Sequence, residues 1–326
     1  MRVLSAADVE RLFHLDLAIE SQRAAFTALG RGEAVLPPRL LIPGGGPAGN
    51  PASTAFCYAA RLSPDGAAVS KFGSVNPANA ALGLPTVSAV ITVLDAGDGH
   101  PVAVLDGTSV TTLRTSAASA VAVSALAVPG ARTLAVLGSG VQARGHVRAI
   151  ARVCPDLDEV RIYGPDPSRR ETLARQISTL PGGPAARAVP SAREAVRSAD
   201  IVACCTTSAS PVLDEAWLAP GALVISVGSF EPDRSEVPAS LVSSADAVVV
   251  DDAAAAVMDA GPVIAAIAAG AAAAGDLIPL GSVLTGQAPG RRADTDVIYY
   301  NSVGLGVQDA AAALAIVDAV AAESPE

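Results

Sequence analysis

Lys71 is the first residue of this chain whose chemistry can be singled out. Lysine and arginine together number 22, and Lys71 is the only lysine among them. A sequence that uses arginine for nearly every positive charge has little reason to keep one compact ammonium group unless its chemistry is needed. Residues 67–75 are apolar and typical of a strand, so we expect desolvation to lower the pKa of Lys71 and let it exchange a proton. The competing interpretation is a surface lysine without a role.

A glycine-rich turn over residues 138–143 is the strongest motif of the sequence. Gly138, Gly140 and Ala143 form the pattern G-x-G-x-x-A after an apolar run at 133–137 and before a helical segment at 144–153. Such glycines let the backbone approach a pyrophosphate, which free N–H groups at the helix N-terminus stabilise. This order of strand, turn and helix predicts a dinucleotide site. The alternative is a tight turn in a Rossmann-like fold that binds no nucleotide.

The residues after the next strand predict which dinucleotide is used. NAD-binding units carry an Asp or Glu there, which accepts a hydrogen bond from the adenosine ribose. Here the strand at 160–163 is followed by Gly164, with Arg169 and Arg170 a few residues further on. A missing carboxylate beside arginines favours NADP(H) over NAD(H). The alternative is that Asp166 reads the ribose.

The elements that must position these residues fall into two regions with different patterns of predicted secondary structure. Two helices are expected within the first 30 residues, the first opened by a capping-box pattern at 5–8. An antiparallel sheet follows, with strands expected at 39–42, 55–62, 67–75, 85–94 and 101–105, and then a helix at 111–126. Strands at 133–137, 160–163, 201–206, 223–227 and 247–250 alternate with helical segments and predict a parallel α/β domain.

Composition excludes several classes of function. The chain has 326 residues, 51% of them apolar, which supports a full core in two domains or one large α/β unit. A net charge of −10 argues against a nucleic-acid partner, which would need clustered basic residues. The four cysteines and three histidines lack metal-ligand spacing, so no metal site is expected.

Targeting and membrane signals are also missing from the sequence. The first residues lack the apolar core of a signal peptide. Asp259, Gly261 and Pro262 interrupt the alanine-rich stretch at 253–275, so no membrane span is expected there. We therefore expect a protein of the reducing cytoplasm with no membrane partner.

A set of motifs in one order makes the chain resemble the ornithine cyclodeaminase and mu-crystallin family over nearly its whole length. These motifs are Pro38-Arg39, Lys71 with Asn79, 106–107, 112–118, 138–143, 227–229 with Glu236, 285–286, 290–291, and 302–304 with Asp309. The resemblance implies an α/β fold in which a Rossmann NAD(P)-binding domain, 126–303, is inserted into an α+β domain with an antiparallel sheet. That second domain, 1–125 plus 304–326, would bind the substrate and form a homodimer through its sheet.

The resemblance also implies roles for individual residues. Arg39, Lys71 and Arg114 match positions that hold the carboxylate of a small-molecule substrate, and Lys71 would be the catalytic acid–base group. The expected cofactor contacts are Arg114, Thr115, Gly138, Ser139, Gly140, Val141, Gln142, Gly164, Arg169, Thr206, Thr207, Val227, Ser229, Ser302 and Gly304. We expect Leu41, Phe56, Tyr58, Phe72 and Phe230 to line the rest of the pocket.

One departure from the family pattern separates the possible reactions. Cyclodeaminases of the family carry a Val-Gly-x-Asp stretch whose Asp is the acid–base group, and this chain has Phe230 at that place. The departure favours an NAD(P)H-dependent reductase of an imino acid, of the ketimine or Δ1-pyrroline-2-carboxylate type, or of a 2-oxo acid. Three alternatives stay open: a cyclodeaminase with a substitute acid, an opine-type or amino-acid dehydrogenase, and a non-catalytic ligand-binding protein.

Overall fold

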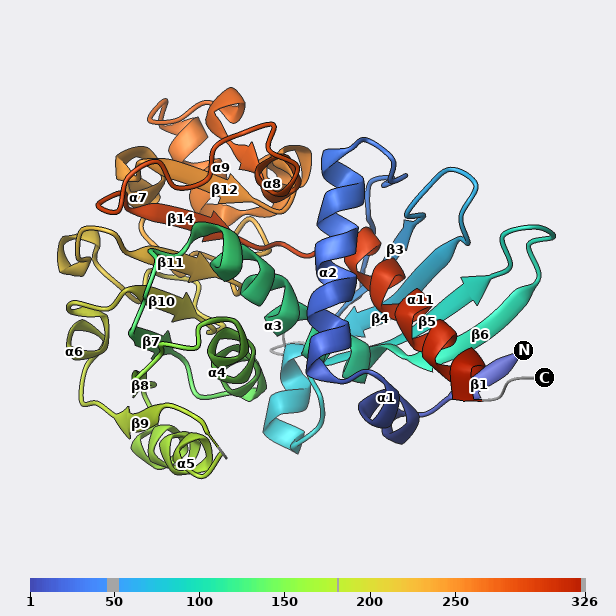
Figure 1. Cartoon of the computed structure of the whole chain (residues 1–326), viewed down its shortest axis with the longest axis horizontal. Helices are drawn as coiled ribbons and strands as arrows, with labels where there is room; N and C mark the ends of the chain where they lie inside the picture. Colours follow the sequence, from blue (N-terminus) through green and yellow to red (C-terminus); the bar gives the residue numbers. More distant parts are fainter. Residues whose placement is uncertain (46–52, 181, 324–326) are drawn as a thin grey trace. The chain divides into compact units, whose positions relative to one another are not determined.

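The computed structural model describes residues 1–45, 53–180 and 182–323, which form two compact units. Unit 1 comprises residues 1–114 and 305–326, and unit 2 comprises residues 115–304 (Figure 1). The helix α3 (Gly107–Leu126) contributes to both, so compactness divides the chain inside this helix. The domain boundary expected from the sequence, at 125/126, falls at the end of α3.

Unit 1 contains a six-stranded sheet in the order β1-β6-β5-β4-β3-β2. Its strands are β1 (Arg2–Leu4), β2 (Leu40–Pro43), β3 (Thr54–Ala60), β4 (Val69–Val75), β5 (Val87–Leu94) and β6 (Pro101–Asp106), and the turn η1 (Pro77–Leu82) joins β4 to β5. β2 to β6 pair antiparallel, as predicted. β1 was not predicted, and it pairs parallel with β6, so the sheet is mixed at this edge.

Three further helices complete unit 1: α1 (Ala6–Leu12), α2 (Leu15–Gly30) and α11 (Gly306–Glu323). Ser5 and Asp8 form the capping box expected at the start of α1. α11 packs on β3, β4 and β5, with α2 beside it (Figure 1). One face of the sheet is therefore covered by a helix from the C-terminal end of the chain.

The pleat of the sheet sorts its side chains between two faces. Tyr58 stands opposite Lys71, and Lys71 opposite Ile91, so these three share the face on which α11 packs. The other face carries Leu40, Ile42, Phe72 and Val90, which are 58%, 46%, 52% and 49% exposed. Phe72 thus points away from Lys71, and the expectation that it lines the same pocket is wrong.

Unit 2 is a doubly wound parallel sheet in the order β13-β12-β14-β11-β10-β7-β8-β9. Its strands are β7 (Thr133–Leu137), β8 (Glu159–Tyr163), β9 (Ala185–Ala188), β10 (Ile201–Cys204), β11 (Leu223–Ser226), β12 (Ala247–Val250), β13 (Ile278–Pro279) and β14 (Ile298–Asn301). The chain order reverses between β7 and β10, where Rossmann folds bind their ligand beyond the carboxyl ends of the strands. This confirms the Rossmann prediction, although β9, β13 and β14 were missed.

Helices and short turns connect these strands. They are α4 (Val141–Val153), α5 (Pro167–Ser178), α6 (Ala192–Val196), η2 (Glu215–Trp217), α7 (Ala239–Ser244), α8 (Ala253–Asp259), α9 (Gly261–Ala268), η3 (Ala274–Asp276) and α10 (Leu280–Leu284). Within the described ranges, no helix is both long and apolar enough to cross a bilayer.

A buried histidine joins α4 to α3 inside unit 2. His146 places one ring nitrogen 2.9 Å from the Ser119 hydroxyl and the other 2.8 Å from the carbonyl of Gln142. Burial lowers the pKa of His146 to about 4, so the ring is neutral at physiological pH. It is a packing group with its polar atoms satisfied.

Candidate functional site

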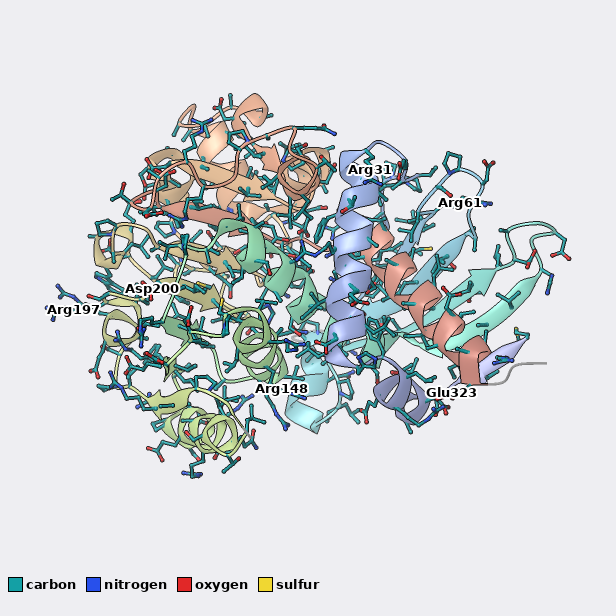
Figure 2. All side chains as sticks on the ribbon, viewed as in Figure 1. Arg31, Arg61, Arg148, Arg197, Asp200 and Glu323 are labelled. Atoms are coloured by element: carbon teal, nitrogen blue, oxygen red, sulfur yellow. The ribbon has the colours of Figure 1, made fainter. Side chains whose placement is uncertain are left out.

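The cationic cluster (Arg39, Lys71 and Arg114) lies in unit 1, and two of its members contact the carboxylate of Asp309. The Lys71 Nζ is 2.6 Å from Asp309 Oδ2, and their side chains are only 3% and 2% exposed. Arg114 Nε donates to the other oxygen, Asp309 Oδ1, at 3.2 Å. By contrast, Arg148 and Arg197 of unit 2 lie at the protein surface (Figure 2). The surface interpretation of Lys71 is therefore wrong.

The first turns of α3 bring two side chains to Lys71. The Asp106 carboxylate caps this helix by accepting from the Ser109 N–H at 2.7 Å. Gly107 sits so close to β5 that an added Cβ would lie 2.9 Å from the Ala89 carbonyl oxygen. Thr111 and Arg114 then follow at helical spacing on one face, and Lys71 Nζ lies 3.5 Å from the Thr111 hydroxyl.

Asp309 comes from the first turn of α11. Gly306, three residues before Asp309, lies against β3, where an added Cβ would come within 3.0 Å of the Ala59 carbonyl oxygen. This close approach lets the first turn of the helix reach Lys71 on the neighbouring strand β4. Sequence reasoning noted Asp309 as a family motif but assigned it no role. A lone acid within the alanine-rich segment 306–317 was the available signal.

Two aromatic rings of β3 form the wall beside Lys71. Its Nζ lies 4.8 Å from the ring centroid of Tyr58 and 5.7 Å from that of Phe56, within cation–π range. The Tyr58 hydroxyl accepts from Arg39 at 3.2 Å, which joins the third cation to the group. Gly73 leaves room for the Phe56 ring, because a Cβ there would lie 2.8 Å from it.

The charges around Lys71 do not balance. Lys71 and Arg114 share one carboxylate, so this part of the cluster carries a positive excess that favours an anion. Burial is the largest cause that lowers the pKa of Lys71, to about 8; Arg114 also lowers it, whereas Asp309 raises it. The ammonium can therefore release a proton close to neutral pH, as the sequence led us to expect.

The glycine turn of unit 2 fits a dinucleotide pyrophosphate. Gly138 has φ +126°, and an added Cβ would lie 2.3 Å from the Cys205 carbonyl oxygen on the neighbouring strand end. Gly140 is the N-cap of α4 and has no side chain to occupy the first N–H groups of the helix. A Cβ at Gly140 would meet nothing within 4 Å. Gly138 thus shapes the turn, whereas Gly140 leaves space in front of the helix.

A pocket of about 350 Å³ adjoins this turn. It is lined by Ser139, Gly140, Val141, Arg144, Ser168, Arg169, Thr172, Leu173 and Gln176. In the part of the chain that the structure describes, neither Arg144 nor Arg169 forms an ion pair with a carboxylate. The pocket therefore presents two guanidinium groups beside the start of α4, and sequence reasoning had missed Arg144.

The residues after β8 are engaged in local contacts. Asp166 caps α5 by accepting from the Arg169 N–H at 3.2 Å. Arg170 donates to the Gly164 carbonyl at 2.9 Å and lies over the Tyr163 ring. Arg169 is the arginine of this pair that lines the pocket.

Glu236 organises the strand ends at which further cofactor contacts were expected. Its buried carboxylate accepts from the Thr206 N–H and hydroxyl at 2.5 and 2.8 Å, from the Ser226 hydroxyl at 2.8 Å, and from the Gly228 N–H at 2.7 Å. The Ser229 hydroxyl accepts from the Glu236 N–H at 2.8 Å. The polar groups of Thr206 and the Ser229 hydroxyl thus belong to an internal network. This network supports the strand ends at which the cofactor is expected.

Other expected cofactor contacts differ in their surroundings. The Ser302 hydroxyl and the Gly304 N–H both donate to Asp251, at 3.0 and 2.8 Å. Thr207 is exposed beyond β10, and Val227 is buried after β11. Thr115 follows Arg114 on α3, and Gln142 lies in the first turn of α4.

In the Phe230 segment, the acid next to the ring is paired with an arginine. The Arg234 guanidinium lies 4.8 Å from the Phe230 ring centroid and pairs with Glu231 at 2.6 Å. Glu231, the nearest substitute for the missing aspartate, is therefore already bound to an arginine.

One group of side chains with metal-ligating atoms occurs in the β5–β6 hairpin. Asp95, Asp98 and His100 gather there at the surface. His100 Nδ1 pairs with Asp98, and Asp95 accepts from the Gly97 and Asp98 N–H groups at 2.8 and 3.1 Å. These contacts are those of a tight turn.

The chain is similar over nearly its whole length to proteins of one family. The profile of the ornithine cyclodeaminase/mu-crystallin family matches residues 1–324. A Δ1-pyrroline-2-carboxylate reductase of Bacillus cereus (strain ZK / E33L) is 30% identical over 310 residues, which cover 95% of this chain and 93% of the relative.

Two solved structures share both units. The Thermococcus litoralis Δ1-pyrroline-2-carboxylate reductase, in complex with NADH and L-proline, has a TM-score of 0.92 and 30% identity, covering 99% of this chain and 98% of that one. An archaeal alanine dehydrogenase dimer with bound NAD has a TM-score of 0.90 and 28% identity, covering 99% and 97%.

The two glycines of the turn should respond differently to a methyl group. Gly138→Ala should lower the free energy of unfolding by about 2 kcal/mol or more, because the Cβ collides with backbone and the φ angle is unfavourable for alanine. Gly140→Ala, the matched control, should stay within about 1 kcal/mol of the parent and yet weaken dinucleotide binding about tenfold or more. Urea denaturation and calorimetric titration measure the two effects. Equal stability of the two variants would contradict this assignment.

Proposed function

We propose that this chain, which belongs to the ornithine cyclodeaminase/mu-crystallin family, is an NAD(P)H-dependent reductase that acts on a C=N or C=O carbon next to a carboxylate. The observation that carries the proposal is the buried cationic cluster around the sole lysine, whose pKa lies at about 8. A cluster with positive excess binds an anion, and a lysine that titrates near neutral pH can transfer a proton to it.

An imino acid of the ketimine or Δ1-pyrroline-2-carboxylate type is the favoured substrate. The Bacillus relative is named a Δ1-pyrroline-2-carboxylate reductase, and the Thermococcus structure contains L-proline, the reduced form of that imine. The guanidinium groups of Arg39 and Arg114 can hold the substrate carboxylate through paired N–H···O bonds. Phe56 and Tyr58 offer an aromatic wall to the apolar part of the substrate.

The residues of the chain divide the reaction between them. When bound, the nicotinamide dinucleotide supplies the hydride, and the turn at Gly138 and Gly140 with the first N–H groups of α4 would hold its pyrophosphate. The Lys71 ammonium donates the proton that the substrate nitrogen or oxygen needs once its carbon is reduced. Lys71 becomes neutral in this step, which its buried position favours.

Activity assays with a lysine variant test this function. The parent should oxidise NADPH or NADH when given Δ1-pyrroline-2-carboxylate, and Lys71→Met should lower kcat/KM about 100-fold or more with little change in folding. Absorbance of the reduced cofactor measures the rate. A variant within a few-fold of the parent would remove Lys71 from the mechanism.

The same assays separate the reductase from a cyclodeaminase. Ornithine given with NAD should release no ammonia, because Phe230 carries no proton and Glu231 is paired with Arg234. Robust ammonia release from the unmodified protein would overturn the reductase assignment. A protein that binds imino acids without any turnover would be a ligand-binding member.

NADP(H) is the favoured cofactor. Gly164 offers no carboxylate to the ribose, and Asp166 is engaged in capping α5. Arg144 and Arg169 line the pocket next to the glycine turn and suit a 2′-phosphate. The two solved relatives contain NADH and NAD, so this preference would distinguish the present chain from them.

Removal of one arginine tests the cofactor preference. Arg169→Ala should raise the Kd for NADPH about tenfold or more and leave the Kd for NADH nearly unchanged, because only the charge-assisted bonds to the phosphate are lost. The matched control, Arg170→Ala, should affect both cofactors alike, since Arg170 is bonded to the Gly164 carbonyl. Fluorescence titration of both cofactors gives the ratio. Tighter NADH binding by the parent would overturn the preference.

A homodimer formed through the uncovered sheet face completes the proposal. Leu40, Ile42, Phe72 and Val90 form an apolar face on unit 1, and contiguous exposed apolar surface marks an interaction site. The archaeal alanine dehydrogenase of the same fold is a dimer. A second copy of this chain is the proposed occupant.

Mass measurements test the dimer. Light scattering should give a mass of about twice 32.3 kDa for the parent, and Phe72→Glu should reduce it to one chain because a carboxylate would be buried unpaired in the interface. Met258→Glu, at an even more exposed apolar residue of α8, is the control and should leave the mass unchanged. A parent that runs as a single chain would contradict the proposal.

A further inference from the structure

The carboxylate of Asp309 occupies an unusual position among the groups of the cationic cluster. One of its oxygens lies 2.6 Å from the Lys71 ammonium and the other 3.2 Å from Arg114 Nε, and the side chain is almost fully buried. A carboxylate so placed shares its charge between two cations from different elements. It fixes the direction of the lysine as well as its surroundings.

The groups that face Lys71 can be counted from the elements packed around it. β3 provides the Tyr58 ring, α3 provides the Thr111 hydroxyl and Arg114, and α11 provides Asp309. Arg39 acts through the Tyr58 hydroxyl, and the neighbour on β5 is the apolar Ile91. Among these described groups, Asp309 is the negative one at neutral pH, because burial raises the pKa of Tyr58.

The sign of each effect on Lys71 follows from this arrangement. Removal from water and the charge of Arg114 both disfavour the ammonium, whereas the charge and hydrogen bond of Asp309 favour it. Without the carboxylate, burial and the charge of Arg114 would favour a neutral amine, opposed by the weaker contacts with the Tyr58 and Phe56 rings. A neutral amine cannot protonate a substrate nitrogen or oxygen.

We propose that Asp309 is the positioning residue of the site, and that its carboxylate aims the Lys71 ammonium and keeps it protonated over the pH range in which the reductase works. The inference rests on the proposed function, in which Lys71 donates the proton. Asp309 acts through Lys71 and Arg114, and it has no step of its own.

The sole lysine makes a direct measurement possible. Protein labelled with [13Cε]lysine gives one lysine signal, from Lys71, in a chain without other lysines. Its titration reports the pKa of Lys71 without substrate, cofactor or turnover. In Asp309→Asn, which keeps the shape and removes the charge, this pKa should fall by about one pH unit or more. Asp318→Asn, the same change at an exposed position of α11, should leave it unchanged.

The pH dependence of the kinetics provides a second measurement. It would not shift if the role of Asp309 were purely structural. The alkaline limb of kcat/KM for imine reduction should shift to lower pH in Asp309→Asn, so that kcat/KM falls about fivefold or more at pH 8 and recovers toward the parent at pH 6. At pH 6, where Lys71 keeps its proton in the variant, KM for the anionic substrate should stay equal or decrease, because the negative charge of Asp309 is gone. A loss of activity that is the same at all pH values, or an unchanged lysine titration, would overturn the inference.

The outcomes for the two proposals are distinguishable. A parent without reductase activity would contradict the proposed function and leave the lysine titration to decide the role of Asp309. If Asp309→Asn does not fold, the double variant Asp309→Asn with Lys71→Met should fold, because both buried charges of the pair are removed. Failure of the double variant as well would assign Asp309 to folding alone and overturn the inference.

Discussion

The chemistry of unit 1 depends on the contacts that the Asp309 carboxylate makes with Lys71 and Arg114. Burial of an ammonium and a guanidinium costs free energy unless charge and hydrogen bonds compensate, and one aspartate supplies both for Lys71 and Arg114. The compensation is incomplete, since Lys71 and Arg114 are two cations on one carboxylate. The remaining positive charge is what a substrate carboxylate can neutralise, so the same imbalance that costs stability creates the affinity for an anion.

Close backbone approaches make this contact possible. Gly107 and Gly306 allow α3 and α11 to begin against the sheet, where any side chain would collide with the backbone of β5 or β3. Because both helices start at the strand surface, α3 directs Arg114 and the first turn of α11 directs Asp309 toward Lys71. The alternation of side chains along β4 completes the arrangement, because it places Lys71 on the face that α11 covers.

Unit 2 also contains a buried carboxylate that joins several elements, but its partners are different. Glu236 is buried, and its carboxylate joins the ends of β10 and β11 through four hydrogen bonds from Thr206, Ser226 and Gly228. Here the bonds come from neutral donors, so the network fixes loop geometry without creating a positive site. In the proposed function, the phosphates of the cofactor would be held instead by the start of α4 and by the arginines that line the adjacent pocket.

Local patterns in the sequence determined much of this protein. Alternation and apolar runs located the antiparallel strands and most of the Rossmann strands, the motifs identified the family, and the rarity of lysine singled out Lys71. The period of two could also have excluded Phe72 from the pocket of Lys71, because neighbours on a strand face opposite sides. The short strands β1, β9, β13 and β14 escaped prediction, since two to four residues carry little periodicity and pair only because a partner is present. Tertiary structure alone decided that Asp309 meets Lys71 and Arg114, and that Arg144 joins Arg169 at one pocket. These residues lie on separate elements, and no local pattern records which side chains the packing of those elements will bring within a few ångströms of one another.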